Sequence, residues 1–258
     1  GDRVRVHYTC RFPDSSMAAT TRASLAADKA VPKSPVFLPP KHPGGLVVTV
    51  PEPGTALYPK EATLQMGFEE HIHARLAPLV RGMSPGGKVR VDLAAQPIED
   101  LKPELRFHRM ARLQRQPKSV RLQKALFTQR MGKALETGDV VPYLDGFATR
   151  VESIEGNEVV LAVSAEDGTR LDTPFGPSVI RDRGSFYEVR LEVEEGRLVR
   201  IGHRVGRIVK TPDQEERNGL IRKIDTSRVF TIDLGLPFGG ESLTCDVTVE
   251  ALNPETPQ

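Results

Sequence analysis

The chain opens with Gly1-Asp-Arg-Val-Arg-Val-His-Tyr-Thr-Cys10 and comes close to its end with Leu236-Pro-Phe-Gly-Gly-Glu-Ser-Leu-Thr-Cys-Asp-Val-Thr-Val249. In the first stretch Val4, Val6 and Tyr8 alternate with polar side chains, which is typical of a strand with one buried face. The second stretch alternates in the same way. These two segments therefore predict the first and the last strand of the protein, and their relation decides how the chain is closed.

The composition favours β structure and excludes several classes of protein. The 258 residues suffice for one large domain or for two to three small ones, and valine-rich alternating runs are separated by Gly and Asp. The net charge of +2 is too small to imply nucleic acid. No apolar run reaches the roughly 18 residues of a membrane-spanning helix. We therefore expect a soluble protein of unknown compartment, either cytoplasmic or exported with its leader removed.

Several elements can be predicted along the first hundred residues. Residues 13–60 are rich in proline and should be mostly loop, interrupted by a short strand over 46–50. A helix is expected over 68–80, kinked or ended by Pro78, and a strand over 88–93. The predicted apolar face of this helix consists of Phe68, Ile72, Leu76, Leu79 and Val80.

Residues 102–133 hold ten Lys or Arg and one acidic residue, Glu104. Arg106, Arg109, Arg112 and Arg115 recur every third residue and could share much of a helix face. The preferred interpretation is a solvated connector, extended or helical; the alternative is a docking arm for an acidic protein or another polyanion. No aromatic stacking pattern accompanies these residues, so specific nucleic-acid binding is not expected.

An internal repeat follows the basic segment. Residues 151–159 match 221–229, Pro174-Phe-Gly176 matches Pro237-Phe-Gly239, and 187–191 match 245–249. Two copies are too few for a solenoid. They predict two small related β modules.

Cys10 and Cys245 are too few for a disulfide framework and lie in the first and last predicted strands. If those strands are neighbours, a disulfide between them is possible. Two buried free thiols are the preferred interpretation.

Four stretches together resemble FKBP-type peptidyl-prolyl isomerases, above all SlyD-like members with an insert-in-flap domain. They are Gly1–Phe12, Gly67-Phe-Glu-Glu70 with Val80-Arg-Gly-Met83 and Gly87-Lys-Val-Arg-Val91, Pro103-Glu-Leu105 with Pro117-Lys-Ser119, and Leu198–Val249. The resemblance implies a mainly β α+β fold, in which an antiparallel sheet wraps on one short helix. The FKBP-like domain would be discontinuous, formed by 1–100 and 240–258.

The rest of the chain would then form a basic connector (101–135) and two insert-like modules (136–195 and 196–239). In an alternative arrangement, residues 186–193 close the first domain and 197–252 form a separate tail module. The second copy of the repeat is more similar to the family, so we prefer the nested arrangement.

The resemblance also implies a proline-binding cleft, most of which is missing. Tyr8 and Phe68 occupy positions of the family's catalytic aromatics, while Leu64, Gln65 and Met66 replace its Val-Ile-Pro, which binds substrate. The family's Phe-Asp pair is absent around 18–21, its loop tyrosine is absent from 92–97, and Cys245 replaces its last phenylalanine. Phe37 or Tyr58 could refill part of the cleft. The alternative role for Tyr8 and Phe68 is plain core packing.

No cofactor and no metal are expected. His71 and His73 are two residues apart on the predicted helix, so they point in different directions. Glu69 and His73 have the spacing of a shared ligand pair, but a surface pair is the preferred interpretation.

Two functions remain at this point. The first is a protein-binding accessory or structural subunit of a larger assembly with weak or no isomerase activity. The second is an active prolyl isomerase and folding chaperone.

Overall fold

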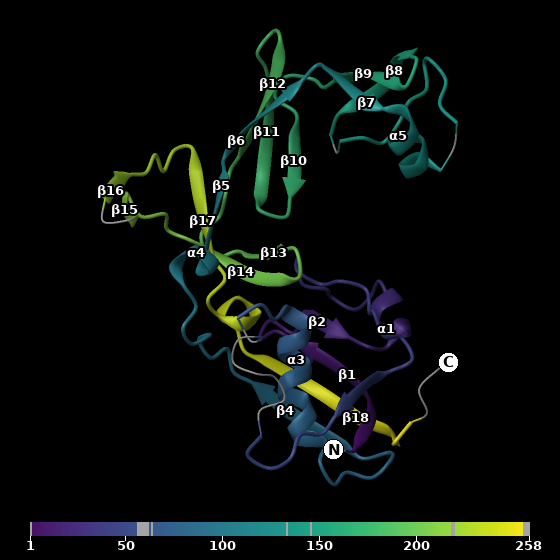
Figure 1. The fold of residues 1–258 in the computed structure, drawn as a ribbon, viewed down its shortest axis with the longest axis vertical. Coiled ribbons are helices and arrows are strands. Elements are labelled where there is room, and N and C mark those ends of the chain that lie inside the picture. Colours follow the sequence, from purple (N-terminus) through teal and green to yellow (C-terminus); the bar gives the residue numbers. More distant parts are fainter. Residues whose placement is uncertain are drawn as a thin grey trace. The chain divides into compact units, whose positions relative to one another are not determined.

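The computed structural model describes residues 2–55, 62, 64–132, 134–144, 146–217 and 220–254. Contacts between Cα atoms divide the chain into two compact units. The first unit holds the residues up to His108, then Gly196–Val209 and the chain from Thr231 onward. The second unit holds Arg109–Glu195 and Lys210–Phe230. The protein is mainly β with few helices, as the alternating sequence predicts (Figure 1).

The first unit is built on a five-stranded antiparallel sheet in the order β2-β1-β18-β4, with β3 also paired to β1. The strands are β1 (Arg3–Arg11), β2 (Met17–Thr20), β3 (Leu46–Thr49), β4 (Lys88–Leu93) and β18 (Leu243–Leu252). The first and last strands of the chain are therefore neighbours, with Tyr8 opposite Val247. Residues 186–191 lie in a different sheet.

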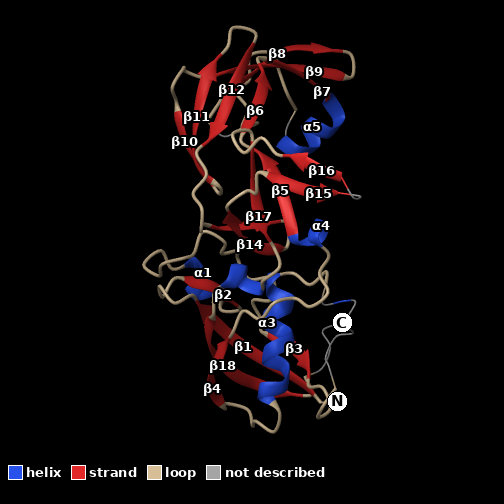
Figure 2. Ribbon diagram, turned by 90° about the vertical axis from the view of Figure 1, so that its left-hand side faces the viewer, coloured by secondary structure: helices blue, strands red, loops and turns tan. Residues whose placement is uncertain are grey.

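One helix covers the buried face of this sheet. Figure 1 and Figure 2 show α3 (Phe68–Leu76) against β1 and β18, and the chain continues as a 3-10 helix, η1 (Ala77–Val80). The helix changes type before Pro78, whose ring nitrogen carries no hydrogen to donate. The predicted apolar face is confirmed at Phe68, Ile72, Leu76 and Val80, but it is wrong at Leu79, which is 44% exposed.

The proline-rich segment is ordered over its described part. Besides β2 and β3 it contains a short helix, α1 (Ala23–Ala27), and its loop is held at Met17, which hydrogen-bonds the carbonyl of Pro32 (2.8 Å) and the amide of Ser34 (3.0 Å). Val36 is only 1% exposed and belongs to the core of the first unit. The strand expected over 46–50 is confirmed as β3.

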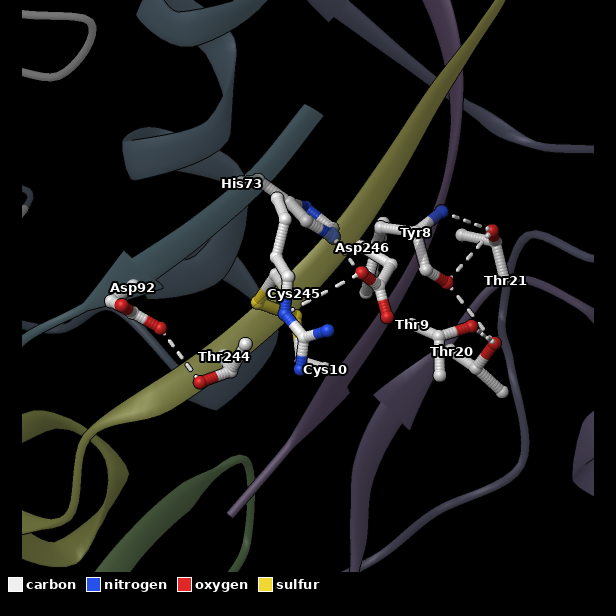
Figure 3. The surroundings of a disulfide bond; sticks show 11 residues. Tyr8, Thr9, Cys10, Thr20, Thr21, His73, Asp92, Thr244, Cys245 and Asp246 are labelled. Carbon is white, nitrogen blue, oxygen red and sulfur yellow. Dashed lines mark hydrogen bonds and ion pairs between the residues drawn. A yellow bond between two sulfur atoms is a disulfide. The ribbon is translucent and has the colours of Figure 1, made fainter. Parts of the chain in front are cut away.

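The two cysteines form a disulfide. Cys10 and Cys245 are direct cross-strand partners of β1 and β18, with their Cα atoms 4.0 Å apart, and both are fully buried (Figure 3). The preference for free thiols is therefore wrong. The condition stated for a disulfide, that the first and last strands be neighbours, is met.

A smaller antiparallel sheet has the order β13-β14-β17-β5. Its strands are β13 (Leu198–Ile201), β14 (Arg204–Val209), β17 (Val229–Asp233) and β5 (Phe107–Ala111). The chain crosses between the two units four times, after His108, Glu195, Val209 and Phe230, and the first and last of these crossings fall within β5 and β17. Two short helices complete the first unit, α4 (Pro103–Arg106) and the 3-10 helix η2 (Pro237–Gly240).

The second unit contains sheets in the orders β10-β11-β12-β6, β7-β9-β8 and β15-β16. The strands are β6 (Leu113–Pro117), β7 (Ser119–Gln123), β8 (Ala148–Glu155), β9 (Glu158–Ser164), β10 (Arg170–Thr173), β11 (Gly176–Asp182), β12 (Phe186–Leu191), β15 (Gln214–Arg217) and β16 (Leu220–Lys223). One helix, α5 (Lys124–Met131), packs its Phe127 into a core with Val151 and Leu161.

Three predictions about the middle of the chain differ from the structure. Residues 101–135 are not a bare connector, because β5, β6 and β7 lie there and pair with other strands. The two copies of the repeat are not equivalent: β8 pairs with β9, whereas their counterparts β16 and β17 lie in different sheets. Residues 196–239 also do not form one unit, since 210–230 group with the second unit and the remainder with the first.

Candidate functional site

Tyr8 lies in the middle of β1 on the face covered by α3, and is 3% exposed. Its hydroxyl is hydrogen-bonded to Nε2 of His73 (3.1 Å), and the two rings meet edge to face at 5.8 Å (Figure 3). Burial, and then the nearby Glu69 and Glu70 carboxylates, raise the pKa of Tyr8. The phenol therefore stays protonated, and its polar end already has a partner inside the protein.

Phe68 is the first residue of α3 and is 1% exposed. Its ring packs between Phe12, at 6.5 Å between centroids, and Phe238, at 5.6 Å edge to face. The guanidinium of Arg200 lies over the same ring at 5.2 Å and donates two hydrogen bonds to the carbonyl of Val36 (2.9 and 2.5 Å). The ring is thus enclosed by aromatic neighbours and by a cation, which attracts its π face.

Gly67 allows the turn between β13 and β14 to lie close to the start of α3. A Cβ at this position would stand 2.8 Å from the carbonyl oxygen of His203, which accepts the amide hydrogen of Phe68 (2.8 Å). Nε2 of His203 also hydrogen-bonds the carbonyl of Gln65 (3.0 Å). Two hydrogen bonds therefore hold the turn between β13 and β14 against the start of α3. Only glycine leaves enough room for this contact at position 67.

The three residues expected to bind substrate, Leu64, Gln65 and Met66, lie beside these hydrogen bonds. Leu64 is half-buried, Gln65 is exposed with its carbonyl occupied, and Met66 is 6% exposed. Tyr8 and Phe68 belong to the same buried core of the first unit, and a substrate role for them stays a prediction. Phe37 is half-buried beside Lys33 rather than in this aromatic cluster, and Tyr58 lies outside the described residues.

Sequence reasoning missed the covering residues. Val36, Arg200 and His203 come from a proline-rich loop and from a β-hairpin far along the chain. Nothing in their local pattern distinguishes them, because their role depends on tertiary contacts alone.

A groove of about 300 Å³ borders the cluster on the other flank of α3. It is lined by Met66, His71, Ala74, Arg75, Gln96, Pro97, Ile98, Glu99 and Pro237.

The described residues contain no group of three or more His, Cys, Asp or Glu side chains that could hold a metal ion. Glu69 forms an ion pair with Lys41 (2.6 Å). The pairing of Glu69 with His73 considered from the sequence is therefore not the contact that these side chains make.

Two histidines of α3 are held neutral. Burial lowers the pKa of His73 to about 4, and burial followed by the charges of Arg75 and Arg204 lowers that of His71 to about 4. Because both values lie below the ordinary one near 6.5, the unfolded chain binds more protons than the folded chain between these limits. The contribution of these two histidines to the free energy of unfolding is therefore fully present above about pH 6.5. It is lost as the pH falls toward 4.

We expect acidification from pH 7 to pH 5 to lower the free energy of unfolding by about 2 kcal/mol for each of these two histidines. Urea unfolding at several pH values, followed by circular dichroism, measures this slope. His73→Gln should remove about half of it. A midpoint that stays constant from pH 7 to pH 5 would contradict the burial of these rings.

The four arginines proposed for docking are divided between the two units. Arg106 is the last residue of α4 and forms a bidentate ion pair with Asp233 (3.0 and 2.8 Å) in the first unit. Arg109, Arg112 and Arg115 belong to the second unit, on or beside β5 and β6. One continuous helix through these residues is not formed, because only Arg106 lies in a helix and the chain beyond it is extended in β5 and β6.

Arg112 and Arg115 each have a partner of their own within the second unit. Nε of Arg112 donates to the carbonyl of Val229 (3.1 Å), and the guanidinium of Arg115 stacks over Phe186 at 4.9 Å. A role in docking therefore stays a prediction for each residue separately.

Over the described part of the chain, no helix has both the length and the apolar character needed to cross a membrane. Comparison with models of known protein families finds no match to this chain, and no curated protein matches it either.

Proposed function

We propose that this chain is a protein-binding factor on an FKBP-like scaffold, with little or no prolyl isomerase activity, and that it acts as an accessory or structural subunit of a larger assembly. The observation that carries the proposal is the covered state of Tyr8 and Phe68, which are 3% and 1% exposed. The family's cleft must open around such aromatics to admit a proline ring. Here Arg200, Phe238 and His73 take that room.

The energetics support the loss of activity. Rotation about a peptide bond has a barrier of roughly 18–20 kcal/mol, which an isomerase lowers with a dry cleft and a donor for the twisted amide. One such donor can be worth about 3 kcal/mol, roughly a hundred-fold in rate. The Tyr8 hydroxyl is already paired with His73, and Cys245, which replaces the family's last phenylalanine, is used in a disulfide.

The second unit supports a binding role. Among the described residues, β10 lies at the edge of its sheet and pairs only with β11. The outer backbone groups of such an edge can accept a strand from another protein. Most assemblies held in this way also use side-chain pockets for specificity.

The decisive test is an isomerisation assay on a short X-Pro peptide with the full chain. We expect the rate constant to equal the uncatalysed value at micromolar protein, and we expect the native protein to elute with a partner after mild extraction. Saturable acceleration that is lost on Tyr8→Phe would overturn the proposal.

The alternative, an active isomerase and chaperone, is favoured by one observation only. Tyr8 and Phe68, which the resemblance assigns to the family's cleft, lie in one buried cluster of the first unit. It would be supported by the same assay, together with suppression of aggregation of an unfolded protein.

A further inference from the structure

The groove beside α3 has the size and lining of a small ligand site. Its volume of about 300 Å³ lies at the lower end of the range for ligand pockets. Met66, Pro97, Ile98 and Pro237 give it an apolar wall. A narrower extension of about 10 Å³ shares Met66, His71, Ile98 and Pro237 with the groove and reaches Arg204.

The guanidinium groups of Arg75 and Arg204 carry positive charge at this groove, and the groups that they contact do not neutralise it. The guanidinium of Arg75 stacks on Phe238 at 5.0 Å and donates to the carbonyl of Ala94. The guanidinium of Arg204 donates to two carbonyls, those of Leu105 (3.1 Å) and Leu234 (2.7 Å). All of these acceptors are neutral.

No carboxylate of the described residues forms an ion pair with either arginine. Partial burial lowers the pKa of both guanidinium groups, so each charge sits where water stabilises it less. A bound anion would supply the missing counter-charge.

His71 is a second and independent sign of a ligand. Its side chain is nine-tenths buried, at 9% exposure, and lines both the groove and its extension. No hydrogen bond joins its ring to any described residue, although buried polar groups ordinarily have partners. Besides Arg75 and Arg204, only the carboxylate of Glu70 acts on its charge.

We propose that this groove binds the C-terminal residue of a partner polypeptide, with the terminal carboxylate at Arg75 and His71 and an apolar last side chain against Met66, Ile98 and Pro237. This inference rests on the proposed protein-binding function. The carboxylate pairs with the guanidinium and accepts the N–H of the imidazole, and the side chain buries the apolar wall.

A chain end fits better than an internal segment. A terminal residue presents a carboxylate and a side chain from one Cα, and the groove has room for little more.

The test compares two forms of a five-residue peptide ending in leucine, one with a free C-terminal carboxylate and one amidated. Calorimetric titration of the full chain should give at least ten-fold tighter binding of the acid, and added salt should weaken it. Arg75→Gln should remove the difference between acid and amide. Arg90→Gln removes the same charge from an exposed position on β4, 3.9 Å from Asp246, and should leave binding unchanged.

Equal binding of acid and amide, or no binding at millimolar peptide, would overturn the inference. So would equal binding of a peptide with blocked ends and an internal aspartate. If Arg75→Gln fails to fold, Ala74→Leu offers a second variant, which narrows the groove without removing a charge and should weaken the acid. These outcomes leave the result of the isomerase assay unchanged. That assay tests the proposed function separately from the peptide site.

Discussion

Replacing both Cys10 and Cys245 with alanine is expected to lower the free energy of unfolding of the first unit by about 4 kcal/mol. The disulfide joins residues 235 positions apart, and a long closed loop restricts the unfolded chain strongly. The second unit lies within this loop. Both cysteines are fully buried between β1 and β18, so alanine removes the bond without adding a polar group to the core (Figure 3). Chemical unfolding of oxidised wild type and variant, followed by circular dichroism, measures the difference.

Reductant provides the control for this experiment. Wild type unfolded and refolded with reductant present should approach the midpoint of the double variant, whereas the variant itself should not respond. Hydrogen exchange at the amides of β1 and β18 identifies which unit has lost stability. Identical midpoints for variant and oxidised wild type would show that the disulfide contributes nothing to the folded state.

The sequence predicts the framework of the first unit well, for a physical reason. Where one face of a strand is buried and the other is wet, the alternation is strong, as in residues 3–11 and 88–93. The helix over 68–80 is equally clear because its buried residues recur at helical spacing. The resemblance at the two ends of the chain also predicts that the first and last strands meet.

The same reasoning fails where no side chain of a strand is fully buried and most of them are polar. Residues 113–117 and 119–123 form β6 and β7, yet their side chains are exposed or half-buried throughout. Basic composition then outweighs a weak alternation, and a connector is predicted. The repeat misleads for a related reason, because local similarity specifies strands and turns but does not specify which strands pair.

The candidate site was only half predictable. Tyr8 and Phe68 are singled out by the resemblance, and in the structure Phe68 begins α3 while Tyr8 contacts His73 of the same helix. The residues that bury these two rings could not be predicted from the sequence. Arg200 and Val36 are 164 residues apart and meet only in the folded chain. A sequence can therefore suggest candidate aromatic residues without indicating that distant segments bury them in the folded chain.

Substituting Phe68 with alanine is expected to lower the free energy of unfolding by about 4 kcal/mol. Removing a fully buried aromatic ring costs about 3–5 kcal/mol, because it leaves a cavity that neighbours fill only partly. Here the change also ends the edge-to-face contact with Phe238 and the stacking of Arg200. Phe68→Leu should cost less, since it keeps part of the apolar volume.

Phe37→Ala is the matched control, because Phe37 is half-buried and lies outside the aromatic cluster. We expect it to cost about 1 kcal/mol or less. The comparison of the two variants by urea unfolding also bears on function. If Phe68→Ala cost no more than Phe37→Ala, the ring would be accessible to solvent, as in an open cleft. The active isomerase would then be the better interpretation of this scaffold.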